Sequence, residues 1–296
     1  MFRIVKAKML VEKIYLLEVE APRIAHTCEP GQFVIVRADE TSERIPLTIC
    51  DYDREAGTVT LVIQVIGASS YKIAQLKTGE MMADITGPLG LPSDFVNEDI
   101  EEVRKRNYLF VCGGLGTAPV LPQIKWMKEH GVSFDVIVGT KTHDTLILEK
   151  EFEEVAGEHY FITTDDGSYK RSGMVTVCME DLIGGEGRHY DVCVAIGPMI
   201  MMKFASQTSL KYGIHTIVSM NPIMVDGTGM CGACRLLIDG EVKFACVDGP
   251  EFDAAKVDFD SAMKRMALYK TEEGRAYLKA QEGDTHHGGC GHCNGD

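Results

Sequence analysis

Three cysteines and one aspartate towards the C-terminal end of the chain have the types and spacing of iron ligands. Cys231 and Cys234 form a C-x2-C pair, Asp226 precedes them in a D-x4-C frame, and Cys246 follows farther along. Plant-type [2Fe-2S] loops read C-x4-C-x2-C and then a distant fourth cysteine. The glycines between these residues permit the tight turns that aim backbone N–H groups at sulfur. We therefore predict a [2Fe-2S] cluster held by Asp226, Cys231, Cys234 and Cys246.

Zinc is the competing metal for a C-x2-C pair. Structural zinc sites usually have two such pairs, whereas Cys246 stands alone in the strand-like run 241–247. A third interpretation is buried thiols beside a surface aspartate, with no metal. A carboxylate oxygen is a harder ligand than a thiolate but can bind iron. Hydroxide or a residue from outside the loop could instead take the position of Asp226, so the spacing favours the cluster and leaves its first ligand open.

Length, charge and composition limit the kinds of protein this chain can be. Its 296 residues are too many for one small core and predict two or three domains. The net charge of -14 disfavours binding to nucleic acid or to an anionic membrane surface. No apolar run reaches the length of a membrane span, and the N-terminus lacks the apolar core of a signal peptide. We therefore expect a cytoplasmic protein whose ten cysteines are thiols or metal ligands rather than disulfides.

Residues 1–97 have the pattern of a small antiparallel β barrel. Runs rich in β-branched and aromatic residues occur at 14–19, 32–36 and 58–65, and turn signals such as Glu29-Pro30-Gly31 separate them. Short strands at this spacing are typical of all-β domains. This barrel would therefore position any ligand that is bound by residues 1–97.

Two polar segments of this barrel could hold a phosphate-bearing ligand. In the first, Arg44 can hold a pyrophosphate through two hydrogen bonds, and Thr48, after Pro46, can bond a phosphate or a ring nitrogen. In the second, residues 67–71 offer backbone N–H groups and hydroxyls before a predicted helix, which suits a phosphate at a helix N-terminus. Each segment also has a simpler interpretation, a solvated arginine beside a strand-edge proline and a serine N-cap.

Strands alternate with helices from residue 98 to 220, which indicates a doubly wound parallel sheet. Ligands bind such sheets beyond the carboxyl ends of the strands. Glycine-containing turns end three of the strands, at Gly113-Gly114, Gly139 and Gly197-Pro198, and would let a nucleotide approach the backbone. The predicted strands lie at 108–112, 134–139, 160–164 and 192–197.

The Gly114-x-Gly116 segment is only part of a dinucleotide-binding fingerprint, because Pro119 occupies the position of the last glycine. Pro119 does fit the first turn of a helix. A plain strand-to-helix turn is the alternative, and the repeated strand-end glycines favour the nucleotide. In a later polar loop, Lys170 and Arg171 could meet a ribose phosphate or simply be solvated.

Residues 221–258 form the predicted cluster segment, and residues 259–296 a helical segment followed by a tail. The tail carries metal-binding side chains separated by glycines, and we assign it no metal. Cys112 and Cys193 lie in apolar strands and are expected in the core. The metal-binding residues of the tail are His286, His287, Cys290, His292 and Cys293.

Taken in order, these motifs resemble the ferredoxin–NADP reductase superfamily, in which a flavin barrel precedes a pyridine-nucleotide domain. The match rests on residues 44–48, 113–119 and 196–199. The cluster loop narrows the resemblance to the branch that contains the electron-transfer subunit of dihydroorotate dehydrogenase. Within that branch the chain is most similar to small subunits of NADH-dependent reduced ferredoxin:NADP+ oxidoreductase, which carry Asp where Asp226 stands. The dihydroorotate subunits carry Cys there and lack the long C-terminal segment.

The resemblance implies an oxidoreductase subunit with FAD in the barrel, NAD(H) on the nucleotide domain and a [2Fe-2S] cluster between FAD and a partner. It also implies a larger iron–sulfur flavoprotein partner, similar to the glutamate synthase small subunit, that binds NADP(H), with ferredoxin serving the complex. The reverse of the coupled reaction is flavin-based electron bifurcation. Because hydride moves between two cofactors, no side-chain acid or base is required, and we predict no catalytic residue.

The cofactor-binding residues that the resemblance implies form one set. They are Arg44, Pro46, Leu47, Thr48, Gln64, Val65, Gly67, Ser69, Ser70, Gly90, Gly113, Gly114, Gly116, Thr117, Ala118, Gly139, Asp166, Gly197, Pro198 and Met199. The residue types at Lys141, Lys170 and Arg171 do not decide between NAD and NADP.

Two other functions remain open. One is the electron-transfer subunit of an NAD-dependent dihydroorotate dehydrogenase, which Asp226 disfavours. The other is a non-enzymatic redox sensor, which a complete nucleotide domain disfavours.

Overall fold

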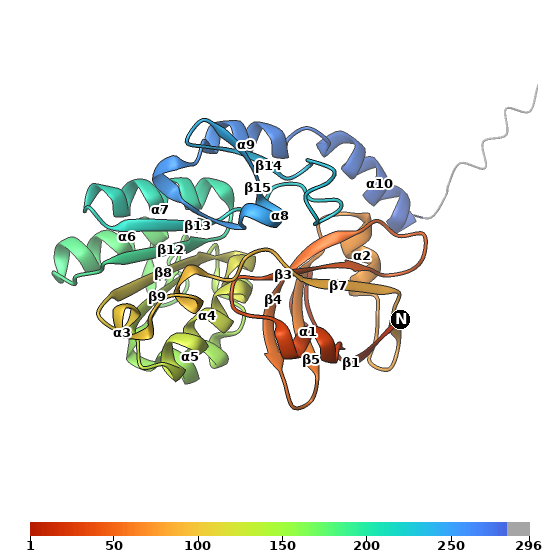
Figure 1. Cartoon of the computed structure of the whole chain (residues 1–296), viewed down its shortest axis with the longest axis horizontal. Coiled ribbons are helices and arrows are strands. Elements are labelled where there is room, and N and C mark those ends of the chain that lie inside the picture. The colour runs from red at the N-terminus through yellow and green to blue at the C-terminus, as the bar shows by residue number, and fades with distance from the viewer. Residues whose placement is uncertain (283–296) are drawn as a thin grey trace, which may run out of the picture.

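A computed structural model describes residues 1–282. The histidines and cysteines of the predicted tail lie outside these residues. Two seven-stranded sheets dominate the described chain, and a small hairpin and a pair of helices follow them (Figure 1). No helix among the described residues is long and apolar enough to cross a membrane.

The predicted barrel is confirmed as a curled antiparallel sheet in the order β6-β1-β2-β5-β4-β3-β7. Inward side chains such as Ile4, Leu17, Val34 and Leu61 are fully buried and form its core, as expected of strands with one face packed inside. Two short helices, α1 (Pro22–Thr27) and α2 (Ala68–Ala74), complete the domain. The strands are β1 (Phe2–Val11), β2 (Ile14–Glu20), β3 (Phe33–Arg37), β4 (Ile45–Asp53), β5 (Thr58–Gln64), β6 (Met81–Met82) and β7 (Asp84–Leu89).

The second sheet confirms the doubly wound prediction. Its order is β11-β10-β9-β8-β12-β13-β16, and every pairing is parallel except that of β13 with the edge strand β16. The strands are β8 (Asn107–Gly113), β9 (Ser133–Thr140), β10 (Tyr160–Thr164), β11 (Arg171–Ser172), β12 (Val192–Ile196), β13 (His215–Ser219) and β16 (Glu251–Asp253). The helices of this part are α3 (Ile100–Val103), α4 (Thr117–Glu129), α5 (Glu149–Ala156), α6 (Val175–Glu180) and α7 (Met199–Lys211).

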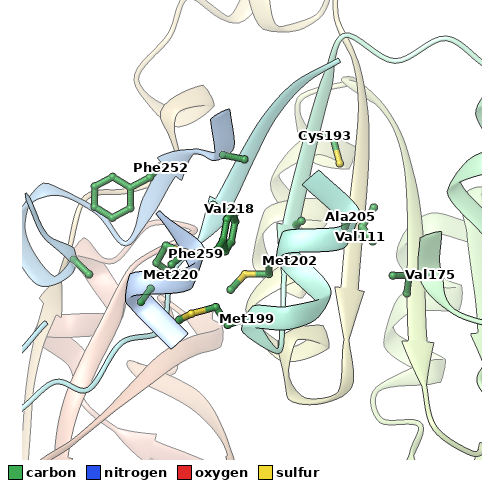
Figure 2. Close-up of a cluster of buried hydrophobic side chains, with 14 of the residues drawn as sticks. Val111, Val175, Cys193, Met199, Met202, Ala205, Val218, Met220, Phe252 and Phe259 are labelled. Atoms are coloured by element: carbon green, nitrogen blue, oxygen red, sulfur yellow. The ribbon is translucent and has the colours of Figure 1, made fainter. Parts of the chain in front are cut away.

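Strand β8 shows why both faces of this sheet are covered. Leu109 and Val111 enter one core, with residues of α6 and α7, while Phe110 and Cys112 enter the other, with residues of α4 and α5. Successive side chains point to opposite faces, so a continuous apolar run supplies two cores. Figure 2 shows part of the first core, where Met202 of α7 lies among residues from several elements.

The last part of the chain connects the two sheets. A hairpin of β14 (Arg235–Ile238) and β15 (Glu241–Phe244) leads into α8 (Ala245–Asp248), and the chain then enters the second sheet as β16. Thus a strand from the predicted cluster segment 221–258 is part of the second sheet. The helices α9 (Phe259–Met266) and α10 (Lys270–Glu282) end the described chain. The proposed domain boundaries near residues 97 and 220 stay predictions.

Candidate cofactor site

One cavity of about 2240 Å³ lies between the barrel and the carboxyl ends of the nucleotide strands. It brings together most of the residues predicted to bind a flavin or a nucleotide, although the two groups come from different sheets. The predicted residues that line it are Arg44, Pro46, Leu47, Thr48, Gln64, Gly67, Ser69, Ser70, Gly113, Gly114, Gly116, Ala118, Gly139, Gly197 and Pro198. Those outside its lining are Val65, Gly90, Thr117, Asp166 and Met199, together with the four predicted iron ligands.

The barrel wall of the cavity is built around the turn before α2. The hydroxyl oxygen of Ser70 accepts hydrogen bonds from the backbone N–H groups of Ile66 and Gly67 at 3.0 and 2.9 Å, and the hydroxyl donates to the Gly67 carbonyl at 2.9 Å. Ser70 therefore shapes the turn. A Cβ atom built on Gly67 would meet nothing within 4 Å. The backbone is open to the cavity there, which fits a group that must approach it closely.

Two further side chains of this wall already have partners. Ser69 is buried and donates its hydroxyl to Glu43 Oε2 at 2.8 Å. Arg44, just before β4, pairs with Asp84 at 3.5 Å and keeps about half of its side chain exposed. The exposed guanidinium remains available to an anionic group in the cavity.

On the opposite wall of the cavity, formed by the strand ends of the second sheet, glycine is required for two different physical reasons. A Cβ on Gly116 would lie 2.3 Å from the Ile196 carbonyl oxygen, and one on Gly139 would lie 2.3 Å from Val175 Cγ1. These two glycines are needed for close packing of the strand ends. Gly114 has φ +54° and nothing within 4 Å of its Cβ position. Of these three, Gly114 is the one that leaves backbone open to a ligand.

Asp165, which the sequence analysis did not select, lines the cavity beside Thr140 and Lys141. Asp166 turns into its own loop, where its carboxylate accepts a hydrogen bond from the Ser168 N–H at 3.0 Å. Hydrogen bonding by Ser168 lowers the pKa of Asp166. A signal for Asp165 was present in the sequence, because it directly follows a predicted strand, and ligands of such sheets bind at the carboxyl ends of the strands.

The basic pair of the polar loop lies away from this cavity. Arg171 forms ion pairs with Glu186 at 3.1 Å and with Asp181 at 3.5 Å. Lys170 lies over the ring of Tyr169. Neither basic side chain lines the large cavity. Their positions agree with the solvated interpretation of the loop.

The predicted iron ligands are partly assembled. The sulfur atoms of Cys234 and Cys246 lie 3.3 Å apart and both residues are buried. Burial, followed by the neighbouring Cys234, raises the pKa of Cys246 to about 12. Cys231 is exposed. Within residues 1–282, no three His, Cys, Asp or Glu side chains are arranged to hold a metal ion.

Asp226 is engaged in the turn of its own loop. Its Oδ2 atom accepts hydrogen bonds from the N–H groups of Thr228 at 3.0 Å and Met230 at 3.4 Å, and from the Thr228 hydroxyl. These bonds, chiefly those from Thr228, lower the pKa of Asp226, and the positive charge of Arg44 contributes. The electrostatic attraction between Arg44 and Asp226 thus couples the barrel wall to the predicted cluster loop.

The donor set itself fits an iron–sulfur cluster. It offers three thiols and one carboxylate from a loop whose Gly227 has φ +82°. A Cβ on Gly227 would lie 2.9 Å from both Ile35 Cγ1 and Leu89 Cδ1 of the barrel. The glycine therefore lets the loop pack directly against the barrel, beside the cavity that would hold a flavin.

Comparisons with known proteins agree with this organisation. Residues 221–258 match the iron–sulfur cluster binding domain of dihydroorotate dehydrogenase B. The chain is 41% identical to a dihydroorotate dehydrogenase B electron transfer subunit homolog of Thermotoga maritima, over 93% of each chain. It is 32% identical to the electron transfer subunit of Geobacillus thermodenitrificans, covering 86% of this chain and 96% of that one.

A solved structure is similar over almost the whole length. It is that of an NADH-dependent reduced ferredoxin-NADP oxidoreductase studied for flavin-based electron bifurcation, with a TM-score of 0.86 and 38% identity over 95% of this chain and 98% of the other. The fold is also that of phthalate dioxygenase reductase, with a TM-score of 0.56 at 13% identity. These matches confirm the predicted superfamily. The chain belongs to the family of dihydroorotate dehydrogenase B electron transfer subunits, which are oxidoreductase subunits.

Proposed function

We propose that this chain is the electron-transfer flavoprotein subunit of a flavin-bifurcating NADH-dependent reduced ferredoxin:NADP+ oxidoreductase. It would exchange hydride between NAD(H) and FAD and pass single electrons between FAD and a [2Fe-2S] cluster. The observation that carries the proposal is the single cavity shared by the barrel and the strand ends, with the predicted cluster loop packed beside it through Gly227. This arrangement suits a hydride donor and a one-electron outlet on either side of one flavin.

FAD would be held by the barrel wall. The open backbone at Gly67 and the half-exposed guanidinium of Arg44 fit its pyrophosphate, while Pro46, Leu47 and Thr48 would face its ring. Bound flavin supplies the conversion between a two-electron hydride and one-electron steps. Ser70 acts indirectly, because it holds the turn that presents Gly67.

NAD(H) would lie on the strand-end wall. Gly114 offers an open backbone for the pyrophosphate, and Asp165 offers a carboxylate that can accept hydrogen bonds from ribose hydroxyls. A carboxylate at that position would also repel a 2′-phosphate, and for this reason we propose NAD(H) rather than NADP(H) as the nucleotide of this wall.

The cluster would be held by Cys231, Cys234 and Cys246, with Asp226 as the proposed first ligand. Iron binding would draw the exposed Cys231 towards the buried pair and release thiol protons. The role of Asp226 is tested by Asp226→Cys. A shift of the g-values in the electron paramagnetic resonance (EPR) spectrum supports ligation by the carboxylate, and an unchanged spectrum contradicts it.

The partner that we propose is a larger iron–sulfur flavoprotein that binds NADP(H), with ferredoxin acting through the complex. Support comes from the 38% identity to the ferredoxin-NADP oxidoreductase chain and from Asp at position 226. The match of residues 221–258 to the dihydroorotate dehydrogenase B domain supports a second candidate, the partner of a dihydroorotate-oxidising subunit.

Reconstitution separates the two candidates. The anaerobically purified chain is combined with the larger subunit or with a dihydroorotate dehydrogenase catalytic subunit, at equal flavin content. Our proposal predicts NADP+ reduction that requires both NADH and reduced ferredoxin with the first partner, and no dihydroorotate-dependent NAD+ reduction with the second. The opposite result would assign the chain to dihydroorotate oxidation. Binding that depends on cluster oxidation state, without NADH oxidation, would instead indicate a redox sensor.

A further inference from the structure

The C-terminal helix pair crosses from the nucleotide sheet to the barrel. Helix α9 packs on α7, and its Phe259 and Ala262 are buried in the core that contains Met202. Helix α10 packs on α2, the helix that follows the open turn at Gly67. Figure 1 shows α9 above the hairpin and α10 running from there down to the barrel. The pair therefore joins the two walls of the cofactor cavity.

Polar contacts hold α9 near both of its ends. Lys203 Nζ of α7 lies 2.7 Å from Asp260 Oδ1. Arg265 Nη2 donates a hydrogen bond to the Ala233 carbonyl at 3.2 Å, within the predicted cluster loop. With its buried apolar residues, α9 is thus anchored to both the nucleotide domain and the cluster loop.

Helix α10 buries fewer apolar side chains than α9. Its contact with the barrel includes the rings of Tyr71 and Tyr277, which meet edge to face with their centroids 6.1 Å apart. Its next residue, Leu278, is 55% exposed. A helix with few buried apolar side chains opens at low free-energy cost. Helix α10 can therefore separate from α2 while α9 stays in place.

One face of α10 forms part of the cavity wall. Four residues line the cavity, with a spacing that puts them on a single helix face. They are Glu272, Glu273 and Ala276 of α10 and Tyr269, which directly precedes the helix. Ala68 and Ser69 of the barrel line the same cavity. An aromatic ring and carboxylates match the base and sugar hydroxyls of a dinucleotide better than its phosphates.

We propose that α9 and α10 form a strap that closes the cavity over bound FAD, and that α10 must leave α2 before FAD can dissociate. The proposal rests on the proposed function, because it takes FAD as the ligand of the barrel wall. Closure by α10 slows FAD release without adding to the chemistry of the bound flavin.

The test is the FAD dissociation rate of the holoprotein, followed by flavin fluorescence with an excess of apoflavoprotein as a trap. Chains ending at residues 269 and 282 are compared, because both lack the tail and differ only by α10. We expect the shorter chain to release FAD about tenfold faster or more, as expected when a contact of ordinary strength is lost. Equal release rates from two folded chains would overturn the strap.

A point substitution provides a second test that does not depend on whether the shorter chain folds. Tyr277→Ala removes the ring contact with Tyr71 and should speed release about threefold to tenfold, the effect of one aromatic pair. Arg275→Ala, on the same helix but outside the cavity lining, is the control and should leave the rate unchanged. No difference between these variants would overturn the proposal. A full chain that binds no FAD would overturn both the strap and the proposed function.

Discussion

The sulfur atoms of Cys234 and Cys246 lie 3.3 Å apart in the buried base of the cluster loop. They flank the open end of the hairpin β14–β15, since Cys234 precedes β14 and Cys246 lies in α8 just after β15, and Arg235 pairs with Phe244 between them. The hairpin register therefore sets their separation. Cys231 lies on the exposed side of the loop. In the proposed ligand set, the fold would therefore hold two ligands in place and the others would close around the metal.

We predict that Cys246→Ser abolishes cluster binding and leaves flavin binding intact. The neutral serine hydroxyl is a much poorer iron ligand than the thiolate it replaces, and the cavity residues do not include Cys246. Iron and flavin content of the anaerobically purified protein measure both effects. Cys178→Ser, at a buried thiol of α6 in the same core, serves as the control and should retain iron. Full iron content in Cys246→Ser would remove this residue from the ligand set.

The position of Asp165 in the cavity predicts an effect on the preference for NADH over NADPH. Asp165→Asn should lower kcat/KM for NADH by about tenfold, the value of one hydrogen bond to a charged group, and should narrow the preference over NADPH. The assay is flavin reduction by each nucleotide under anaerobic conditions. Asp166→Asn is measured beside it, because the structure holds that carboxylate in its own turn. A larger loss from Asp166→Asn would assign the ribose carboxylate to Asp166 instead.

Close packing at the strand ends predicts a change in stability. Gly116→Ala should lower the free energy of unfolding by about 1–3 kcal/mol, the usual effect of overpacking, because its Cβ would meet the backbone of Ile196 and Gly197 at 2.3 to 2.7 Å. Gly185→Ala is the matched control, since nothing lies within 4 Å of its Cβ position. Thermal unfolding monitored by circular dichroism compares the two. Equal unfolding temperatures would contradict the packing account.

The partly buried carboxyl group of Glu251 predicts a pH effect on stability. Glu251 of β16 accepts hydrogen bonds from Gln123 of α4 at 2.6 Å and from Ser93 at 2.9 Å. Burial, only partly offset by the bond from Ser93, raises the pKa of Glu251 to about 7. The folded chain therefore holds this proton at pH values where the unfolded chain has lost it. Stability from this group is full below the ordinary carboxyl pKa and declines as the pH rises towards 7.

Glu251→Gln isolates that effect, because the amide stays neutral at every pH. Relative to the unchanged protein, the variant should gain stability on the order of 1–3 kcal/mol between about pH 5 and pH 8. Unfolding temperatures across this range give the difference, and the exposed Glu20→Gln should parallel the unchanged protein. A variant that runs parallel to the unchanged protein at all pH values would contradict the assignment to Glu251.

Much of the fold follows from patterns that the sequence makes visible. Continuous apolar runs such as that at Tyr108 to Cys112 predict central parallel strands, and the structure places them there. The edge strand β16 was not predicted, because three residues carry too little pattern and its pairing with β13 depends on a distant part of the chain.

The site was less predictable than the fold. Spacing identified the cysteines, but whether Asp165 or Asp166 faces the cavity depends on how the loop after β10 turns. The cavity face of α10 could not be found from sequence, because its position depends on tertiary packing against α2. Motifs identify residues whose types can bind a cofactor. Which of these residues lie together depends on how elements that are distant in the sequence pack against each other.

The most direct test of the central claim is anaerobic NADH titration of the purified chain, followed by visible absorbance and EPR on the same samples. Our account predicts bound flavin and iron, bleaching of the flavin on addition of NADH, and a [2Fe-2S] signal that develops with it. A chain with neither flavin nor iron, or one whose iron–sulfur signal does not respond while NADH reduces its flavin, would contradict the proposed path from NADH through FAD to the cluster.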